Sequence, residues 1–253
     1  MVWFVGAGPG AEDLITVRGA KLLREADVVI YAGSLVNPAL LAGCRPGCEL
    51  HDSARMTLEQ VLQTVSAAEA QGRTTVRLHT GDPCLYGAIR EQMDALDEAG
   101  IEYAVVPGVS SFCGAAAALR AEYTLPGVSQ TVVITRMAGR TPVPEREQIR
   151  SLAKSGSTMV VFLSASLLEQ LQQELLQGAY TADTPAAIVY KATWPDERVY
   201  RCTVGTLAET ARKNGVTRLA LITVGGFLGP CAERSKLYDP SFATGYREAS
   251  HEH

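Results

Sequence analysis

Short β-branched runs alternate with longer amphipathic segments along the whole chain. The short runs are typical of strands and the amphipathic segments of helices, and their alternation is the pattern of βαβ units. In the first half of the sequence we expect strands at residues 2–6, 27–31, 74–79 and 102–106, and helices near 16–25, 57–70, 88–99 and 111–119. The alternation therefore predicts an α/β fold.

The pattern breaks at Pro126 and Gly127, where we place a domain boundary. This division predicts an N-terminal α/β domain with glycine-rich loops at 1–124 and a C-terminal α/β domain at 125–253. In the second domain we expect a helix near 145–154 and strands at 131–136, 159–163, 186–190, 198–204 and 219–224. The third and fourth of these strands flank the segment Ala192-Thr-Trp-Pro-Asp and are typical of a hairpin, which would make the second sheet mixed.

Composition excludes several classes of function. Apolar residues make up 47% of the 253, enough to bury a substantial core, and a net charge of -4 carries no basic excess for general nucleic-acid binding. The N-terminal segment Met1-Val-Trp-Phe-Val-Gly is typical of a strand and not of a signal peptide. No apolar run approaches the roughly 20 residues that cross a bilayer, so we expect a cytoplasmic protein without membrane or nucleic-acid partners.

The cysteines favour structural thiols. They include no C-x-x-C pair and no grouping with histidine at zinc spacing, so we expect reduced side chains and no metal. The six positions are Cys44, Cys48, Cys84, Cys113, Cys202 and Cys231.

A first glycine-rich loop, Gly6-Ala-Gly-Pro-Gly, follows the first expected strand. One interpretation is a dinucleotide-binding loop, but that fingerprint needs backbone N–H groups where Pro9 stands, and proline has none. The acidic residue expected about 20 positions later is also misplaced, because Glu25 and Asp27 come before the second strand and not at its end. A nicotinamide-dependent oxidoreductase stays an alternative of a different class.

Two more glycine-containing loops follow strands. His79-Thr-Gly-Asp-Pro ends the strand at 74–79, where Gly81 allows close backbone approach and Asp82 can accept hydrogen bonds, although Asp-Pro is also ordinary turn chemistry. Val106-Pro-Gly-Val-Ser-Ser ends the strand at 102–106, and its serines suit either a helix cap or a ligand. Three such loops at strand ends on one face favour a ligand site there.

These motifs resemble those of the tetrapyrrole methylases over nearly the whole chain. The shared features are the first loop with Leu14-Ile-Thr-Val-Arg-Gly, then Thr80-Gly-Asp-Pro, and then Pro107-Gly-Val-Ser-Ser. Three further segments resemble the C11-methyltransferase branch, which acts on precorrin-4 or cobalt-precorrin-4 in corrin (vitamin B12) synthesis: Tyr31-Ala-Gly-Ser-Leu-Val, Thr135-Arg-Met-Ala-Gly-Arg-Thr-Pro-Val-Pro-Glu and Val189-Tyr-Lys-Ala-Thr-Trp-Pro-Asp-Glu.

The resemblance implies two α/β domains of the tetrapyrrole methylase type with S-adenosyl-L-methionine in the cleft between them, and a homodimer. It also implies S-adenosyl-L-homocysteine as the product of the cofactor. The cofactor-binding positions that it implies are Pro9, Thr80, Gly81, Asp82, Leu85, Ser110, Ser111, Leu163, Ser164, Ala187 and Ala192. Ala11 departs from the family pattern, since many members have aspartate at that position.

The implied reaction is methyl transfer to carbon 11 of the macrocycle with loss of a ring proton. Positioning and exclusion of water would supply most of the catalysis, and a general base would assist. His79 is the candidate base, and the alternative is a histidine that only bonds a neighbouring loop. Candidates for substrate contact are Tyr31 and Ser34 at a strand end, and arginines that would pair with substrate carboxylates: Arg18, Arg55, Arg90, Arg136 and Arg140.

Three questions stay open at the level of sequence. The substrate could belong to another tetrapyrrole-pathway step, and the chain could be a corrinoid-binding module without catalysis. The C11 branch itself includes enzymes for the cobalt-containing and the metal-free ring, and the segments at Tyr31 and His51 resemble the cobalt enzymes somewhat more.

Overall fold

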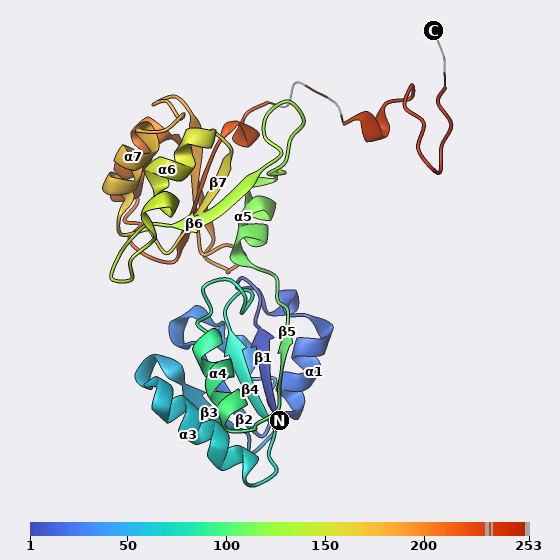
Figure 1. The fold of residues 1–253 in the computed structure, drawn as a ribbon, viewed down its shortest axis with the longest axis vertical. Helices are drawn as coiled ribbons and strands as arrows, with labels where there is room; N and C mark the ends of the chain where they lie inside the picture. Colours follow the sequence, from blue (N-terminus) through green and yellow to red (C-terminus); the bar gives the residue numbers. More distant parts are fainter. Residues whose placement is uncertain (231–232, 234, 251–253) are drawn as a thin grey trace. The chain divides into compact units, whose positions relative to one another are not determined.

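The computed structural model describes residues 1–230, 233 and 235–250. They divide into two compact units (Figure 1). The first comprises Met1–Ala115 with Lys191–Glu197, and the second comprises Ala116–Tyr190 with the described part of Arg198–His253. The units divide between Ala115 and Ala116, inside the helix Ser111–Leu119, whereas the boundary expected from the sequence is at 124/125.

The first unit is built on a parallel sheet with the strand order β3-β2-β4-β1-β5. Its strands are β1 (Val2–Gly6), β2 (Val28–Tyr31), β3 (Glu49–Asp52), β4 (Thr75–His79) and β5 (Tyr103–Val106). Its helices are α1 (Val17–Glu25), α2 (Pro38–Leu41), α3 (Leu58–Glu69), α4 (Arg90–Glu98) and the first part of α5 (Ser111–Leu119). The four expected strands are confirmed to within one residue, whereas β3 and α2 were not expected.

Helices cover both faces of this sheet (Figure 1). On one face Leu23 of α1 packs against alternate strand residues such as Val5 and Leu78. On the other face Val65 of α3 and Leu96 of α4 pack with the intervening strand residues. Alternation of the strand side chains between two buried faces explains the continuous apolar character of β1 and β2.

The connections out of β1 and β4 leave in opposite directions. From β1 the chain passes through α1 to β2, on the far side of β4, and from β4 it passes through α4 to β5, on the far side of β1. Ligands in open α/β sheets bind at such a reversal, outside the carboxyl ends of the strands. The fold of the first unit thus marks the loops after β1 and β4 as a binding region.

The second unit has a mixed sheet with the order β6-β7-β10-β8-β9. Its strands are β6 (Val132–Arg136), β7 (Thr158–Phe162), β8 (Pro185–Tyr190), β9 (Arg198–Thr203) and β10 (Ala220–Val224). Only β6 and β7 pair in parallel, and β8 and β9 form the expected antiparallel hairpin. The expected strands of this half are confirmed to within one residue.

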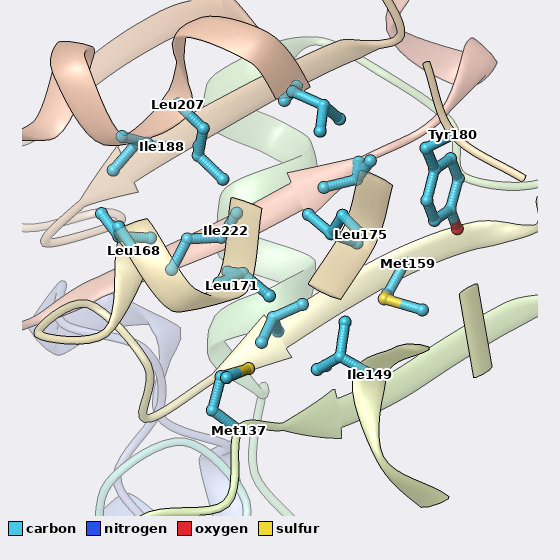
Figure 2. Packing of buried hydrophobic residues seen from close by; sticks show 14 of the residues in the cluster. Met137, Ile149, Met159, Leu168, Leu171, Leu175, Tyr180, Ile188, Leu207 and Ile222 are labelled. Carbon is cyan, nitrogen blue, oxygen red and sulfur yellow. The ribbon is translucent and has the colours of Figure 1, made fainter. Parts of the chain in front are cut away.

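Three helices of the second unit pack on one face of its sheet. They are α6 (Ile149–Leu152), α7 (Leu168–Leu176) and α8 (Leu207–Lys213), of which α7 and α8 were not expected. Figure 2 shows their contribution to the core, where Ile149, Leu171 and Leu207 meet Met159 and Ile222 of the sheet. The expected helix near 145–154 is a short α6 flanked by 3-10 turns at Glu145–Glu147 and Ala153–Ser155.

Among the described residues, no helix is long and apolar enough to cross a membrane. The five cysteines at positions 44, 48, 84, 113 and 202 are free thiols, as expected, and Cys231 lies outside the described residues. Burial raises the pKa of Cys44 to about 11, and the neighbouring Cys48 adds to this effect. Such a thiol stays protonated at neutral pH, which fits a structural role.

Candidate active site

Three glycine-containing loops of the first unit meet at the carboxyl ends of β1, β4 and β5. Gly8 and Gly81 form an isolated bridge in which each backbone N–H donates to the other's carbonyl, at 3.2 and 2.8 Å. A Cβ atom at Gly108 would lie only 2.1 Å from the carbonyl oxygen of Gly81 and 2.7 Å from Cα of Gly6. The loops therefore touch through backbone, a contact that only glycine allows.

The contact between the three loops also brings several of the expected cofactor-binding residues close together. A Cβ at Gly81 would lie 3.5 Å from Cα of Ser110 and 3.5 Å from the backbone nitrogen of Ser111, the first residue of α5. Pro9 of the first loop and Ser110 of the third are buried, whereas Thr80 and Leu85 of the second loop are half-buried. The expectation that the three loops converge is correct, and the binding roles of these residues stay a proposal.

Asp82 fastens the second loop to the third. One carboxylate oxygen accepts from the backbone N–H of Cys84 at 2.7 Å, and the other accepts from the N–H of Gly108 at 2.8 Å. Burial acts to raise the pKa of Asp82, but the hydrogen bonds from Cys84 and Gly108 outweigh it and hold the pKa below its ordinary value. Asp82 is therefore ionised at neutral pH, with both oxygens already bound to backbone.

Most backbone N–H groups of the first loop donate hydrogen bonds to other residues of the protein. The N–H groups of Ala7, Gly8 and Ala11 donate to the carbonyls of His79 and Gly81 and to the hydroxyl of Thr193. Pro9, between them, has no N–H. A dinucleotide-binding loop must aim several of these groups at a pyrophosphate, so the structure removes the main support for a nicotinamide cofactor.

His79 is buried at the end of β4. It is 4% exposed, its ring lies 6.0 Å from that of Phe4, and its Nε2 atom has no hydrogen-bond partner among the described residues. Burial lowers the pKa of His79 to about 3, and the nearby charge of Arg77 adds to this effect. A neutral imidazole without exposed surface is a poor proton acceptor for a bulky substrate, so these features favour the structural interpretation over the general base.

Arg77 is a buried cation that the sequence analysis did not single out. Its Nε donates to Oε1 of Gln92 and its Nη1 to the carbonyl of Ile30, both at 3.0 Å. Burial lowers its pKa to about 10. A lone arginine in a strand gives no signal in a single sequence, because the glutamine that holds it comes from a helix later in the chain.

In the second unit, the ends of β6 and β7 are joined by Ser164. Its hydroxyl donates to the carbonyl of Phe162 at 2.6 Å and accepts from the N–H of Met137 at 2.9 Å, and the residue is fully buried. Next to it, Leu163 is 67% exposed at φ 51°. A leucine in the left-handed region is an outlier, and such strain gathers at functional sites. Leu163 is therefore the more favourable of the two for ligand contact, and Ser164 orients it.

The two expected alanines are buried. Ala187 lies in β8 and is fully inaccessible, and Ala192 lies in the segment Lys191–Glu197 and is 6% exposed. That segment belongs to the first unit, where the indole Nε1 of Trp194 donates to the carbonyl of Pro9 at 3.1 Å. Ala192 therefore shares a unit with the first loop.

The expected substrate residues are dispersed within their units. Arg18 on α1 is exposed, Arg55 lies 3.9 Å from the carboxylate of Asp52, and Arg90 pairs with Asp94 at 2.8 Å. In the second unit Arg140 is exposed, but Arg136 donates to the carbonyls of Met137, Thr141 and Pro142, which ties it to its own loop. These hydrogen bonds engage the guanidinium of Arg136, and they would compete with binding of a substrate carboxylate.

Tyr31 and Ser34 follow β2. Tyr31 is half-buried and its carbonyl accepts from the hydroxyl of Ser53 at 2.9 Å, while Ser34 lies in the 3-10 helix Gly33–Leu35. Both are near a strand end in the first unit, and contact with substrate stays a prediction for them.

The chain matches the family model of the tetrapyrrole (corrin/porphyrin) methylases over residues 1–208. A cobalt-precorrin-4 C(11)-methyltransferase of Methanocaldococcus jannaschii is 50% identical over 249 residues, which cover 98% of this chain and 96% of that protein.

Two solved structures are similar. A cobalt-precorrin-4 methyltransferase matches with a TM-score of 0.88 and 48% identity over 90% of this chain and 96% of its own. A uroporphyrin-III C-methyltransferase from Thermus thermophilus, complexed with S-adenosylhomocysteine, matches with a TM-score of 0.76 and 29% identity over 92% of this chain and 95% of its own. With its converging glycine loops and a match along most of its length, this chain belongs to the tetrapyrrole methylase family.

Proposed function

We propose that the chain transfers a methyl group from S-adenosyl-L-methionine to carbon 11 of cobalt-precorrin-4 in corrin synthesis. The observation that carries the proposal is the meeting of the three glycine loops at the ends of β1, β4 and β5, fastened by Asp82. These loops carry the motifs shared with the family, and a relative 50% identical over 249 residues bears the name of this activity.

The cofactor would bind along the three glycine loops of the first unit. Backbone and small side chains line the meeting point of the loops, which suits a ligand that must approach the chain closely. Within the second unit, the exposed and strained Leu163 is a candidate for ligand contact. Asp82 would hold the second loop against the third, and each of its oxygens keeps a further acceptor site for a ligand.

Methyl transfer requires little from the protein beyond positioning of the methyl donor and the substrate. S-adenosylmethionine supplies a methyl group on a positively charged sulfur, which is already activated for displacement. The residues of this chain would orient the substrate carbon and exclude water. Because His79 is buried with its pKa at about 3, we infer that no histidine base acts at that position.

The test is a comparison of substrates with labelled S-adenosylmethionine under anaerobic conditions. We expect methyl incorporation into cobalt-precorrin-4, with the new methyl group at carbon 11 by nuclear magnetic resonance. Preference for metal-free precorrin-4 would move the chain to the other group of the branch. Incorporation into uroporphyrinogen III alone would refute the C11 assignment, and retention of the tetrapyrrole without transfer would identify a binding module.

We also infer, from the family resemblance, that the chain works as a homodimer in the cytoplasm. Analytical ultracentrifugation of the purified protein should show a species of twice the chain mass, and fractionation of cells should recover it with the soluble enzymes. A monomer at micromolar concentration would contradict the homodimer, and recovery in another cell fraction would contradict the cytoplasmic location.

A further inference from the structure

We propose that Trp194 is a positioning residue that sets the conformation of the first glycine loop and thereby the affinity for S-adenosylmethionine. The inference rests on the proposed function, in which the first loop takes part in binding this cofactor. It concerns the segment Lys191–Glu197, called the tip below, which follows β8 and belongs to the first unit.

The tip holds three consecutive residues of the first loop. The indole Nε1 of Trp194 donates to the carbonyl of Pro9 at 3.1 Å, and the hydroxyl of Thr193 accepts from the N–H of Ala11 at 3.0 Å. Between them, a Cβ at Gly10 would lie 2.1 Å from Cδ1 of Trp194, so the indole ring lies directly against the loop backbone.

The tip is itself held in an unusual conformation. Lys191 and Thr193 have φ values of 48° and 69°, in the left-handed region that threonine and other β-branched residues avoid. The carboxylate of Glu197 accepts from the N–H of Thr193 at 2.6 Å, and Lys191 pairs with Asp196 at 2.6 Å. Strain of this kind persists only where surrounding bonds enforce it, and it is characteristic of sites with a function.

The tip and the first loop also contact α5, the helix that follows the third loop. A Cβ at Gly114, in the first turns of α5, would lie 3.1 Å from Cβ of Pro9 and 3.1 Å from Cγ2 of Thr193. On its other side, the loop receives a hydrogen bond from Nδ2 of Asn37 to the carbonyl of Gly10 at 2.8 Å. Pro9 is thus enclosed by the tip, α5 and its own loop, and a shift of Trp194 would move it.

The first experiment compares two tryptophans of one unit. Trp194→Phe removes the N–H donor but keeps an aromatic ring, and Trp3→Phe makes the same change at the half-buried Trp3 of β1, which packs in the core. We expect Trp194→Phe to raise the dissociation constant of S-adenosylhomocysteine and the KM for S-adenosylmethionine roughly fivefold to tenfold, the equivalent of one hydrogen bond. The kcat should stay within about twofold in both variants.

The Trp3→Phe variant should lower thermal stability without a change in affinity. If both variants lose stability alike and bind S-adenosylhomocysteine as the unmodified protein does, Trp194 only packs and the proposal is wrong. If the unmodified protein itself binds no S-adenosylhomocysteine, the proposed function fails, and this result is distinct from the first.

A double-mutant cycle tests the contact directly. Gly10→Ala should weaken S-adenosylhomocysteine binding, because the new methyl group must displace either the loop or the ring of Trp194. In a Trp194→Ala background this obstacle is gone, so the same change should cost less affinity than in the unmodified protein. Equal costs in the two backgrounds would overturn the proposal, since residues in contact show non-additive effects.

Fluorescence provides an independent readout. The sequence contains two tryptophans, so under selective excitation of tryptophan the emission of the Trp3→Phe variant comes from Trp194. Addition of S-adenosylhomocysteine should shift or quench its emission as Pro9 and the tip adjust to the ligand. An emission spectrum that does not change at saturating ligand would contradict the positioning role.

Discussion

The carboxylate of Asp82 accepts the backbone N–H of Gly108 at 2.8 Å and so binds the loop after β4 to the loop after β5. Its other oxygen accepts from Cys84 within its own loop at 2.7 Å. The family motif places an aspartate here, and the structure explains it as a fastener between loops. A ligand at the meeting point of the loops would depend on Asp82 for the arrangement of the loops, in addition to any direct contact.

Replacement of Asp82 by alanine should therefore cost both stability and activity. Two charge-assisted hydrogen bonds disappear and the N–H of Gly108 loses its acceptor, which should lower the free energy of unfolding by about 2–4 kcal/mol. We expect the rate of methyl transfer to fall below about a hundredth of the rate of the unmodified protein. Asp97→Asn is the control, because the carboxylate of Asp97 is exposed and accepts a hydrogen bond from the hydroxyl of Tyr103 at 3.1 Å. Equal behaviour of the two variants would contradict the fastening role.

Gly108→Ala tests the backbone contact between loops. Its Cβ would lie 2.1 Å from the carbonyl oxygen of Gly81, so the loops must separate, at a cost of about 1–3 kcal/mol. We expect a lower unfolding temperature and loss of S-adenosylhomocysteine binding by calorimetry. A matched change is Gly139→Ala, where no described residue other than its chain neighbours lies within 4 Å of the new Cβ. If the Gly108→Ala variant has the same stability and the same affinity as the Gly139→Ala variant, the loops do not need this contact.

His79→Gln should retain activity and alter the pH dependence of stability. The pKa of His79 is about 3 in the folded chain, below its ordinary value of about 6.5, so the unfolded chain binds more protons between these values. Stability should therefore fall as the pH decreases from about 6.5 towards 3. Glutamine does not titrate, so the variant should lose less stability than the unmodified protein between pH 7 and 5 in urea unfolding.

The kinetic part of the same variant tests the general base. A kcat within about tenfold of the unmodified value supports the structural role of His79. A decrease of a hundredfold or more at unchanged KM, with loss of the acidic limb of the pH profile, would restore the general base that the sequence left open.

Leu163→Gly should separate affinity from stability. Leu163 is 67% exposed at φ 51°, so glycine relieves the strain while little buried surface is lost, and the free energy of unfolding should change by less than about 1 kcal/mol. The affinity for S-adenosylhomocysteine should decrease. Leu219→Gly is the control, since Leu219 also has a positive φ, 55°, in the same unit. A loss of affinity in the control, or none at Leu163, would contradict a ligand role for Leu163.

Much of the fold could be predicted because its signals are local. Strands such as β1 and β4 are β-branched runs that end in glycine turns, and the loops at Gly6, Gly81 and Gly108 could be placed on one sheet edge from βαβ logic alone. The helices α7 and α8 were missed. Both are short, with nine and seven residues, so each offers few turns over which a helical period could be recognised.

The contacts that organise the site could not be predicted, because they join residues far apart in the sequence. The sequence shows that Asp82 is a hydrogen-bond acceptor, but not that Gly108 is its partner. Likewise, the place of Trp194 against Gly10 depends on the tertiary fold, and the burial that lowers the pKa of His79 is a property of the whole unit. The chemistry of a side chain follows from its residue type, whereas its partners are set by the tertiary fold.

The membership of Lys191–Glu197 in the first unit also affects the order of events during synthesis. The ribosome releases Met1–Ala115 early, yet it must translate all of Ala116–Tyr190 before the tip exists. At roughly 5–20 residues per second this interval lasts about 4 to 15 seconds. Throughout that time the nascent sheet can form, but Pro9 and Ala11 lack the bonds that Trp194 and Thr193 provide. Folding of the first unit is therefore completed only when translation of the second is well advanced.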